Sequence, residues 1–241
     1  MSGEVGSVCL MKKPCIDIKT SNAPHRIFLV RHGETDWNRA FRYQGSSDVE
    51  LNASGLDQAR RAGLRLARVV PDRVFTSPLL RALRTAETIM EQNDGDTAIT
   101  LCDDIREISF GVWEGLTITE IKKKDPDTLA AWRDAPFSRA PAEGEKMDDV
   151  VLRSRRASGM IKGSAEGGGV TFVVAHGAVL RALLGVMMDI GDIDIMWKMR
   201  FDNCSVTVLD LWRGRPSLLL VNDTHHIRMP EGDIPLLTFP V

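Results

Sequence analysis

The sequence predicts an α/β fold in which a sheet carries helices on both of its faces. Two observations support this. Short apolar or β-branched segments alternate with longer segments of helical periodicity along most of the 241 residues. In addition, "VTFVVA", residues 170–175, is apolar throughout, as expected of a strand that is buried on both faces. A hydrophobic content of 43% and a charged content of 27% agree with a globular protein that has a core.

Six segments are expected to form strands, because each is a short apolar or β-branched run. They are Arg26–Val30, Arg73–Phe75, Ala98–Cys102, Val170–Ala175, Ser205–Leu211 and Leu218–Val221. Four segments between them show helical periodicity and are expected to form helices. These are residues 53–70, 77–92, 145–163 and 176–190.

The starts of the first two helices carry recognisable signals. Asn52 offers a capping side chain to the first helix, whose apolar stripe includes Leu56 and Val70. Ser77 is expected to cap the second helix, with Pro78 at the first helical position, where proline fits best. These signals predict the direction in which each helix leaves the sheet.

The length is consistent with one large domain. We expect a folded domain over residues 25–228, between an irregular tail at residues 1–24 and a second tail at residues 229–241. The first twenty residues lack the apolar stretch of a signal peptide, and no apolar run approaches the ~18 residues of a membrane span. The four cysteines form no C-x-x-C pair and are expected to be reduced thiols, so we expect a cytoplasmic protein.

The net charge of −2 and the pI of about 6.2 give no global reason to expect nucleic acid or an anionic membrane as a partner. Any positively charged site must therefore be local. In sheets of this kind, ligands bind beyond the carboxyl ends of the strands. Polar groups follow four predicted strands: Arg31 and His32, then Ser77 leading to Arg81, then Glu107, and finally His176 with Gly177.

These groups are suited to phosphoryl transfer. Arginine is a planar, permanently charged fork that matches phosphate oxygens. A neutral histidine such as His32 can attack phosphorus and form a phosphohistidine, while Arg31, Arg81 and His176 compensate the charge. Glu107 can give a proton to the leaving oxygen and later take one from water. Side chains supply the cations, so neither a metal nor a cofactor is expected.

The sequence resembles the histidine phosphatase superfamily, in its phosphoglycerate-mutase-like branch 1. Five blocks occur in the order of that family: "LVRHGETDWN", "RYQGSSDVELNASGLDQA", "TSPLLRALRTAE", "IREISFGVWEG" and "VVAHGAVLRAL". The resemblance covers roughly Arg26 to Val221. It implies a three-layer αβα sandwich around a mostly parallel central sheet.

The resemblance also implies roles for single residues. His32 is the phosphorylated nucleophile and Glu107 the proton donor. The phosphate-binding residues implied are Arg31, Asn38, Arg81, His176 and Gly177, with Gln44 and Gly45 bordering the substrate pocket. Ala178 stands where several relatives have a polar side chain, which weakens inference about the substrate.

The family contains phosphatases and mutases, and the sequence favours a phosphatase. The mutases resembled carry "ERHYG" and a long insertion over the site. This chain has "EISFG" (107–111) and a short segment at 115–144. A shorter lid excludes water less well, so the phosphohistidine is expected to be hydrolysed. The alternatives are a cofactor-dependent phosphoglycerate mutase and a non-catalytic member that only binds phosphate or docks on another protein.

The expected partner is a small phosphorylated metabolite. The sequence does not identify this metabolite, nor does it indicate the oligomeric state of the protein. Val112, Trp113, Trp132 and Phe137 are expected to line the pocket and select the ester. The pair His225 and His226 is interpreted as part of a loop and not as a metal site, because no further ligands have suitable spacing.

Overall fold

The computed structural model describes residues 23–164, 168–190 and 198–238. These residues form a six-stranded sheet in the order β3-β2-β4-β1-β5-β6. The strands are β1 (His25–Arg31), β2 (Arg73–Thr76), β3 (Ile99–Leu101), β4 (Gly169–Ala175), β5 (Val206–Trp212) and β6 (Arg215–Asp223). The first four are parallel, whereas β5 is antiparallel to both β1 and β6. All six predicted strands are present, and the sheet is mostly parallel as expected.

The register of β1 against β4 places two histidines side by side. The strands pair from His25 with Gly169 to Arg31 with Ala175. His32 and His176 follow these last two residues, and the His32 backbone N–H donates to Ala175 O at 2.9 Å. Since both strands are parallel, their carboxyl ends deliver the two side chains to the same edge of the sheet.

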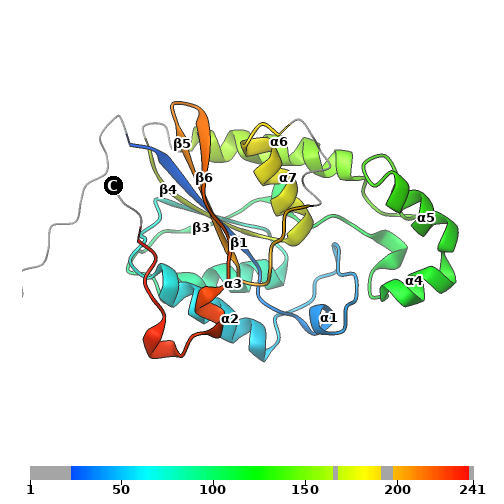
Figure 1. Ribbon diagram of the computed structural model, residues 1–241, viewed down its shortest axis with the longest axis horizontal. Helices are drawn as coiled ribbons and strands as arrows, with labels where there is room; N and C mark the ends of the chain where they lie inside the picture. Colours follow the sequence, from blue (N-terminus) through cyan, green and yellow to red (C-terminus); the bar gives the residue numbers. More distant parts are fainter. Residues whose placement is uncertain (1–22, 165–167, 191–197, 239–241) are drawn as a thin grey trace, which may run out of the picture.

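Helices cover both faces of the sheet and complete the three layers (Figure 1). α6 (Met147–Gly163) and α7 (Gly177–Met187) lie on one face, and α2 (Ala53–Leu66), α3 (Leu80–Met90) and α9 (His225–Arg228) lie on the other. Alternation along β1 separates two cores. Ile27 and Leu29 pack toward α6 and α7, whereas Phe28 and Val30 pack toward α2 and α3.

α4 (Ile118–Lys124) and α5 (Pro126–Asp134) lie to one side of the sheet (Figure 1), and a third, small core packs beneath them. Trp113 is fully buried at its centre, and Trp132 packs edge-on against it with ring centroids 5.7 Å apart. Trp113 and Trp132, expected as pocket walls, are therefore the core that carries the 115–144 segment. α4 and α5 are not among the four helical segments predicted above. The same is true of α1 (Asp36–Arg39) and of the 3₁₀ turns η1 (Asp103–Ile105), η2 (Gly111–Trp113) and η3 (Glu231–Asp233).

The predicted helix starts are confirmed for α2 and wrong for α3. Asn52 caps α2, with its side chain accepting from Gly55 N at 2.9 Å. α3 begins at Leu80 with Leu79 as its N-cap and no side-chain cap. The Ser77 hydroxyl accepts from Leu79 N at 3.3 Å and faces His176 instead, so this serine belongs to the site more than to the helix. Leu56 and Val70 were expected in the apolar stripe of α2, but both are exposed. Leu56 lies outside the buried face of α2, and Val70 lies beyond its end.

The chain after α9 lies along α2. Glu231 pairs with Arg60 at 2.6 Å, and Leu237 is buried in the core on the α2 and α3 side. Residues 229–238 thus have defined contacts, although the expected domain boundary at 228 stays a prediction. The expected N-terminal tail, residues 1–24, lies mostly outside the described residues. In the described part of the chain, no helix is long and apolar enough to cross a membrane.

Two glycines allow the loop after β1 to touch α2. A β-carbon on Gly33 would overlap the carbonyl oxygen of Gly55, and one on Gly55 would overlap Glu34 O. Both obstacles are backbone atoms, which cannot rotate away as a side-chain end can. Glycine at position 33 is therefore required by this close approach of two backbones.

We predict that Gly55→Ala destabilises the protein by about 1–3 kcal/mol, since the added methyl group must push the His32 loop off α2. The matched control is Gly159→Ala on α6, where no atom lies within 4 Å of the added carbon. That control should be neutral or slightly stabilising. Urea denaturation of both variants measures the difference, and equal midpoints for the two would contradict the packing argument.

Candidate active site

The tautomer of His32 is fixed by the backbone of the next residue. Its Nδ1 lies 2.7 Å from Gly33 O, and its side chain is almost fully buried. A carbonyl oxygen can only accept, so Nδ1 must carry the proton. The Nε2 atom of neutral His32 then holds a free lone pair, which is what a nucleophile requires.

His176 lies against His32 with ring centroids 5.1 Å apart. Its Nε2 is 2.7 Å from Ser77 Oγ, and its Nδ1 is buried without a partner among the described residues. The sequence placed Ser77 at a helix cap and therefore missed its role as the group that orients His176.

Two arginines border the histidines and are anchored by backbone carbonyls. Arg31 donates from Nη1 to Phe201 O at 2.6 Å. Arg81 donates to Ser47 O at 2.8 Å and to Gly45 O at 2.7 Å. In both guanidinium groups Nε is buried and has no partner in the described part of the chain. Each arginine is thus held in place while keeping a donor unused.

Glu107 occupies the N-terminus of α7. Its carboxylate accepts from Ala178 N and Val179 N, both at 3.2 Å. A β-carbon on Gly177 would stand 3.7 Å from Arg31 Nε and 3.8 Å from Glu107 Oε2. Both are ordinary contact distances, so the backbone of Gly177 lies beside the arginine and the carboxylate.

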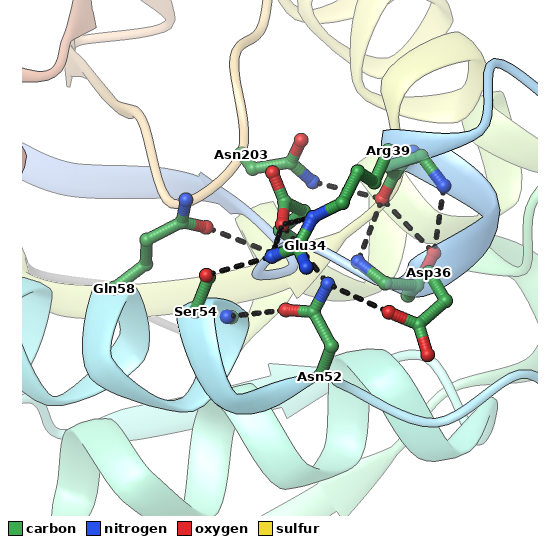
Figure 2. Close-up of polar contacts among 10 residues, drawn as sticks. Glu34, Asp36, Arg39, Asn52, Ser54, Gln58 and Asn203 are labelled. Atoms are coloured by element: carbon green, nitrogen blue, oxygen red, sulfur yellow. Dashed lines mark hydrogen bonds and ion pairs between the residues drawn. The ribbon is translucent and has the colours of Figure 1, made fainter.

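The loop after His32 is fixed by a polar network around Glu34, which Figure 2 shows between Arg39 and Asn52. Glu34 Oε1 accepts from Arg39 Nη2 at 2.7 Å and from Asn52 Nδ2 at 2.9 Å. In the same network, Asn38 Oδ1 accepts from Thr35 N at 3.2 Å, which closes a capping box on α1. This network sets the position of Asn38, one of the predicted phosphate ligands.

The loop with Gln44 and Gly45 is held by Glu114, which the sequence prediction did not single out. Glu114 accepts from the backbone N–H groups of Ser46 at 2.8 Å and Ser47 at 2.9 Å. Gly45, with φ of 57°, and Ser47 turn their carbonyls to Arg81. Glu114 lies in the "WEG" part of the fourth sequence block, which was the signal available for it. Gln44 is buried, and its Oε1 has no partner among the described residues.

Burial and positive charge keep the histidines neutral. Burial is the main cause that lowers the pKa of His32 well below 6.5, and Arg81 and Arg31 lower it further. The pKa of His176 falls in the same way. Burial also lowers the pKa of Arg81 to about 10, which leaves it charged at neutral pH. The site therefore combines neutral imidazoles with two cations.

The unused polar atoms define what the site can bind. Buried donors without partners are costly, so they indicate a ligand that accepts hydrogen bonds. Here those donors are the Nε atoms of Arg31 and Arg81, and both belong to cations. An oxyanion such as a phosphoryl group would satisfy them and offset their charge.

A metal centre is not indicated by the described residues, which contain no group of three or more His, Cys, Asp or Glu side chains able to hold an ion. His225 and His226 lie in the short helix α9 and not in a loop. The buried His226 donates from Nε2 to Cys204 O at 3.0 Å, so its role is to support the segment before β5.

Comparison with protein families gives one match over most of the chain. The family model described as "Histidine phosphatase superfamily (branch 1)" matches residues 27–224. A bifunctional protein of Mycobacterium tuberculosis is 34% identical over 85% of this chain. The chain spans about half the length, 55%, of that relative.

Other relatives match over nearly their whole length. Phosphoserine phosphatase 1 of Hydrogenobacter thermophilus is 29% identical, over 84% of this chain and 94% of its own. A 2,3-bisphosphoglycerate-dependent phosphoglycerate mutase of Cytophaga hutchinsonii is 30% identical, over 88% of this chain and 98% of its own length. The solved structure of Bacillus stearothermophilus YhfR superposes with a TM-score of 0.77 at 34% identity, covering 85% of this chain and all of that one.

We predict that stability falls as the pH drops from about 6.5 to 5.5. The pKa values of His25, His32, His176 and His226 are all lowered in the folded protein, that of His226 to about 4. Below about 6.5 the unfolded chain binds protons that the folded chain does not. For His226, whose pKa is about 4 in the folded protein, the cost is about 1 kcal/mol by pH 5.5, and the other three histidines act in the same direction.

Thermal unfolding between pH 7.5 and 5.5 measures this effect. The control is His226→Gln, which keeps a donor for Cys204 O but cannot titrate, so its melting temperature should fall less steeply. A melting temperature that stays level or rises toward pH 5.5 would show that the histidines are not held neutral.

Proposed function

The chain belongs to the histidine phosphatase superfamily, branch 1, and from this premise we propose that it is a phosphatase that hydrolyses a small phosphate ester through a phosphohistidine on His32. The observation that carries the proposal is the tautomer of His32. Its Nδ1–H is bound to Gly33 O, which leaves the Nε2 lone pair as a nucleophile. Arg31 and Arg81, with buried unused donors, are the groups that would hold the phosphoryl oxygens beside it.

In the first step, His32 Nε2 attacks phosphorus and the bond from phosphorus to the ester oxygen breaks. The leaving oxygen takes a proton from Glu107, which is then ionised. Arg31, Arg81 and Asn38 bind the oxygens of the transferring group, with His176 on the same side. The products are the free alcohol and phosphorylated His32.

In the second step, a water molecule attacks phosphorus and gives a proton to Glu107, while the phosphorus–nitrogen bond breaks and returns its electron pair to His32. Inorganic phosphate leaves and the starting state is restored. The low pKa of His32 favours this release, because the imidazole regains its stable neutral form. Glu107 is thus acid in one step and base in the other.

The choice of water as acceptor rests on the segment that follows Glu107. "EISFG" replaces the "ERHYG" of the mutases resembled, and residues 115–144 form only α4 and α5 on their own aromatic core. A phosphoserine phosphatase among the relatives supports hydrolysis. A phosphoglycerate mutase at similar identity supports the alternative, in which the phosphoryl group returns to an organic acceptor.

The proposal predicts that the purified protein releases inorganic phosphate from p-nitrophenyl phosphate without added metal. Hydrolysis should be observed in the presence of a chelator, because side chains supply all the positive charge. Conversion of 3-phosphoglycerate to 2-phosphoglycerate after priming with bisphosphoglycerate, with no phosphate release, would establish the mutase instead. Binding of phosphate with neither reaction would establish the non-catalytic alternative.

A second prediction concerns the nucleophile. His32→Ala should abolish turnover and the phosphoenzyme together, measured by rapid quench with ³²P-labelled substrate. The matched control is His25→Gln, at the opposite end of the same strand, where His25 is buried and bonded to Thr171 at 2.8 Å. This control should retain labelling even if its stability falls. Labelling that persists in His32→Ala would rule out His32.

A further inference from the structure

The segment 201–205 reaches the active edge of the sheet because β5 runs antiparallel to β1. The residues that precede β5 therefore lie beside the residues that follow β1. Cys204 N donates to Arg31 O at 3.0 Å, and Arg31 Nη1 donates to Phe201 O. The residue before the nucleophile is thus bonded to this segment, and Cys204 N also lies 3.3 Å from His32 O.

We propose that Asn203 is a positioning residue that orients the amide of Asn38 toward the phosphoryl group and ties it to the backbone of the nucleophile. Asn203 Nδ2 lies 2.9 Å from His32 O and 3.2 Å from Asn38 Oδ1. One nitrogen therefore joins the predicted nucleophile and a predicted phosphate ligand. The inference rests on the proposed function, since it assigns Asn38 to the same phosphate site.

The orientation of both amides follows from their backbone neighbours. Thr35 N can only donate, so the Asn38 atom 3.2 Å from it must be Oδ1. His32 O can only accept, so the Asn203 atom beside it must be Nδ2. Each side-chain hydrogen bond that the described residues give Asn38 ends on Oδ1, which keeps the Nδ2 donors for a ligand.

Asn203 is itself rigidly held. Cys204, the next residue, has φ of 52°, a left-handed conformation that a non-glycine residue adopts only when its surroundings enforce it. His226 donates to Cys204 O at 3.0 Å, and Asp202 accepts from Ser205 N at 3.0 Å. Figure 2 shows Asn203 approaching the network around Glu34 from the side opposite Asn52. A fixed donor of this kind restricts the rotation of Asn38.

A matched variant distinguishes the positioning role of Asn203 from mere support of the segment 201–205. Asn222 supports the same segment from its other end, by accepting from Asp202 N at 2.7 Å and donating to Asp202 Oδ2 at 3.0 Å. Its own φ of 49° suits glycine. Asn222→Gly therefore loosens the segment at Asp202 and leaves the contacts of Asn203 with His32 and Asn38 in place.

The test is direct titration calorimetry with inorganic phosphate, which requires no turnover. Asn38→Ala should weaken binding about tenfold to a hundredfold, the loss of a hydrogen bond to a charged group. Asn203→Ala should weaken it about threefold to tenfold, the loss of a neutral one. If Asn203 acts through Asn38, the double variant binds phosphate as Asn38→Ala does, and Asn222→Gly binds as the unaltered chain does.

Two results would overturn the inference: a double variant whose loss is the product of the two single losses, or an Asn222→Gly loss as large as that of Asn203→Ala. If Asn203→Ala does not fold, Asn203→Ser, whose shorter side chain cannot bridge His32 O and Asn38, takes its place in the cycle. The outcome is independent of the assay with p-nitrophenyl phosphate. Failure of hydrolysis alone would refute the proposed function while the coupling of Asn203 to Asn38 could still be observed in phosphate binding.

Discussion

The positive charge of two arginines, Arg81 fully buried and Arg31 partly buried, is the constraint on which the rest of the site depends. Arg81 is fully buried, and burial is the main cause that lowers its pKa. The charge of Glu107 opposes this shift, whereas the charge of Arg31 adds to it. Buried charges without partners cost several kcal/mol. In the part of the chain that the structure describes, neither arginine has a carboxylate within salt-bridge distance, and both are anchored on carbonyl oxygens. The site is thus left with positive charge that an anionic ligand can offset.

Burial is the main reason why the histidines stay neutral, and the same positive charge adds to it. A protonated imidazole between Arg31 and Arg81 would add a third cation to a buried site, so His32 stays neutral. Neutrality together with the bond to Gly33 O is what makes Nε2 a nucleophile. The groups that would bind the phosphoryl oxygens therefore also prepare the atom that attacks phosphorus, and weakening one function would weaken the other.

The sequence predicted the sheet and the principal site residues well because those signals are local. Each of the six strands contains a short apolar or β-branched run. Arg31 ends β1, and His32 and His176 directly follow β1 and β4. The prediction failed where the signal depends on tertiary structure. Ser77 resembles a helix cap, yet its hydroxyl faces His176, which is 99 residues away in the chain. α4 and α5 were missed although each has a local start signal, the capping box of Thr117 and Glu120 for α4 and Pro126 for α5. What the sequence does not reveal is the aromatic core around Trp113 on which both helices pack.

Asn203 and Cys204, which support the loop of the nucleophile, were missed for a further reason: the direction of one strand. The rule that ligands lie beyond the carboxyl ends of strands applies to parallel strands, and β5 is antiparallel. Its amino end, with Asn203 and Cys204, therefore joins the carboxyl ends of β1 and β4. The loop after His32 is consequently bonded on both sides, to α2 through Glu34 and to the start of β5 through Asn203. In a mixed sheet, the residues before an antiparallel strand next to the nucleophile belong in the search for the site.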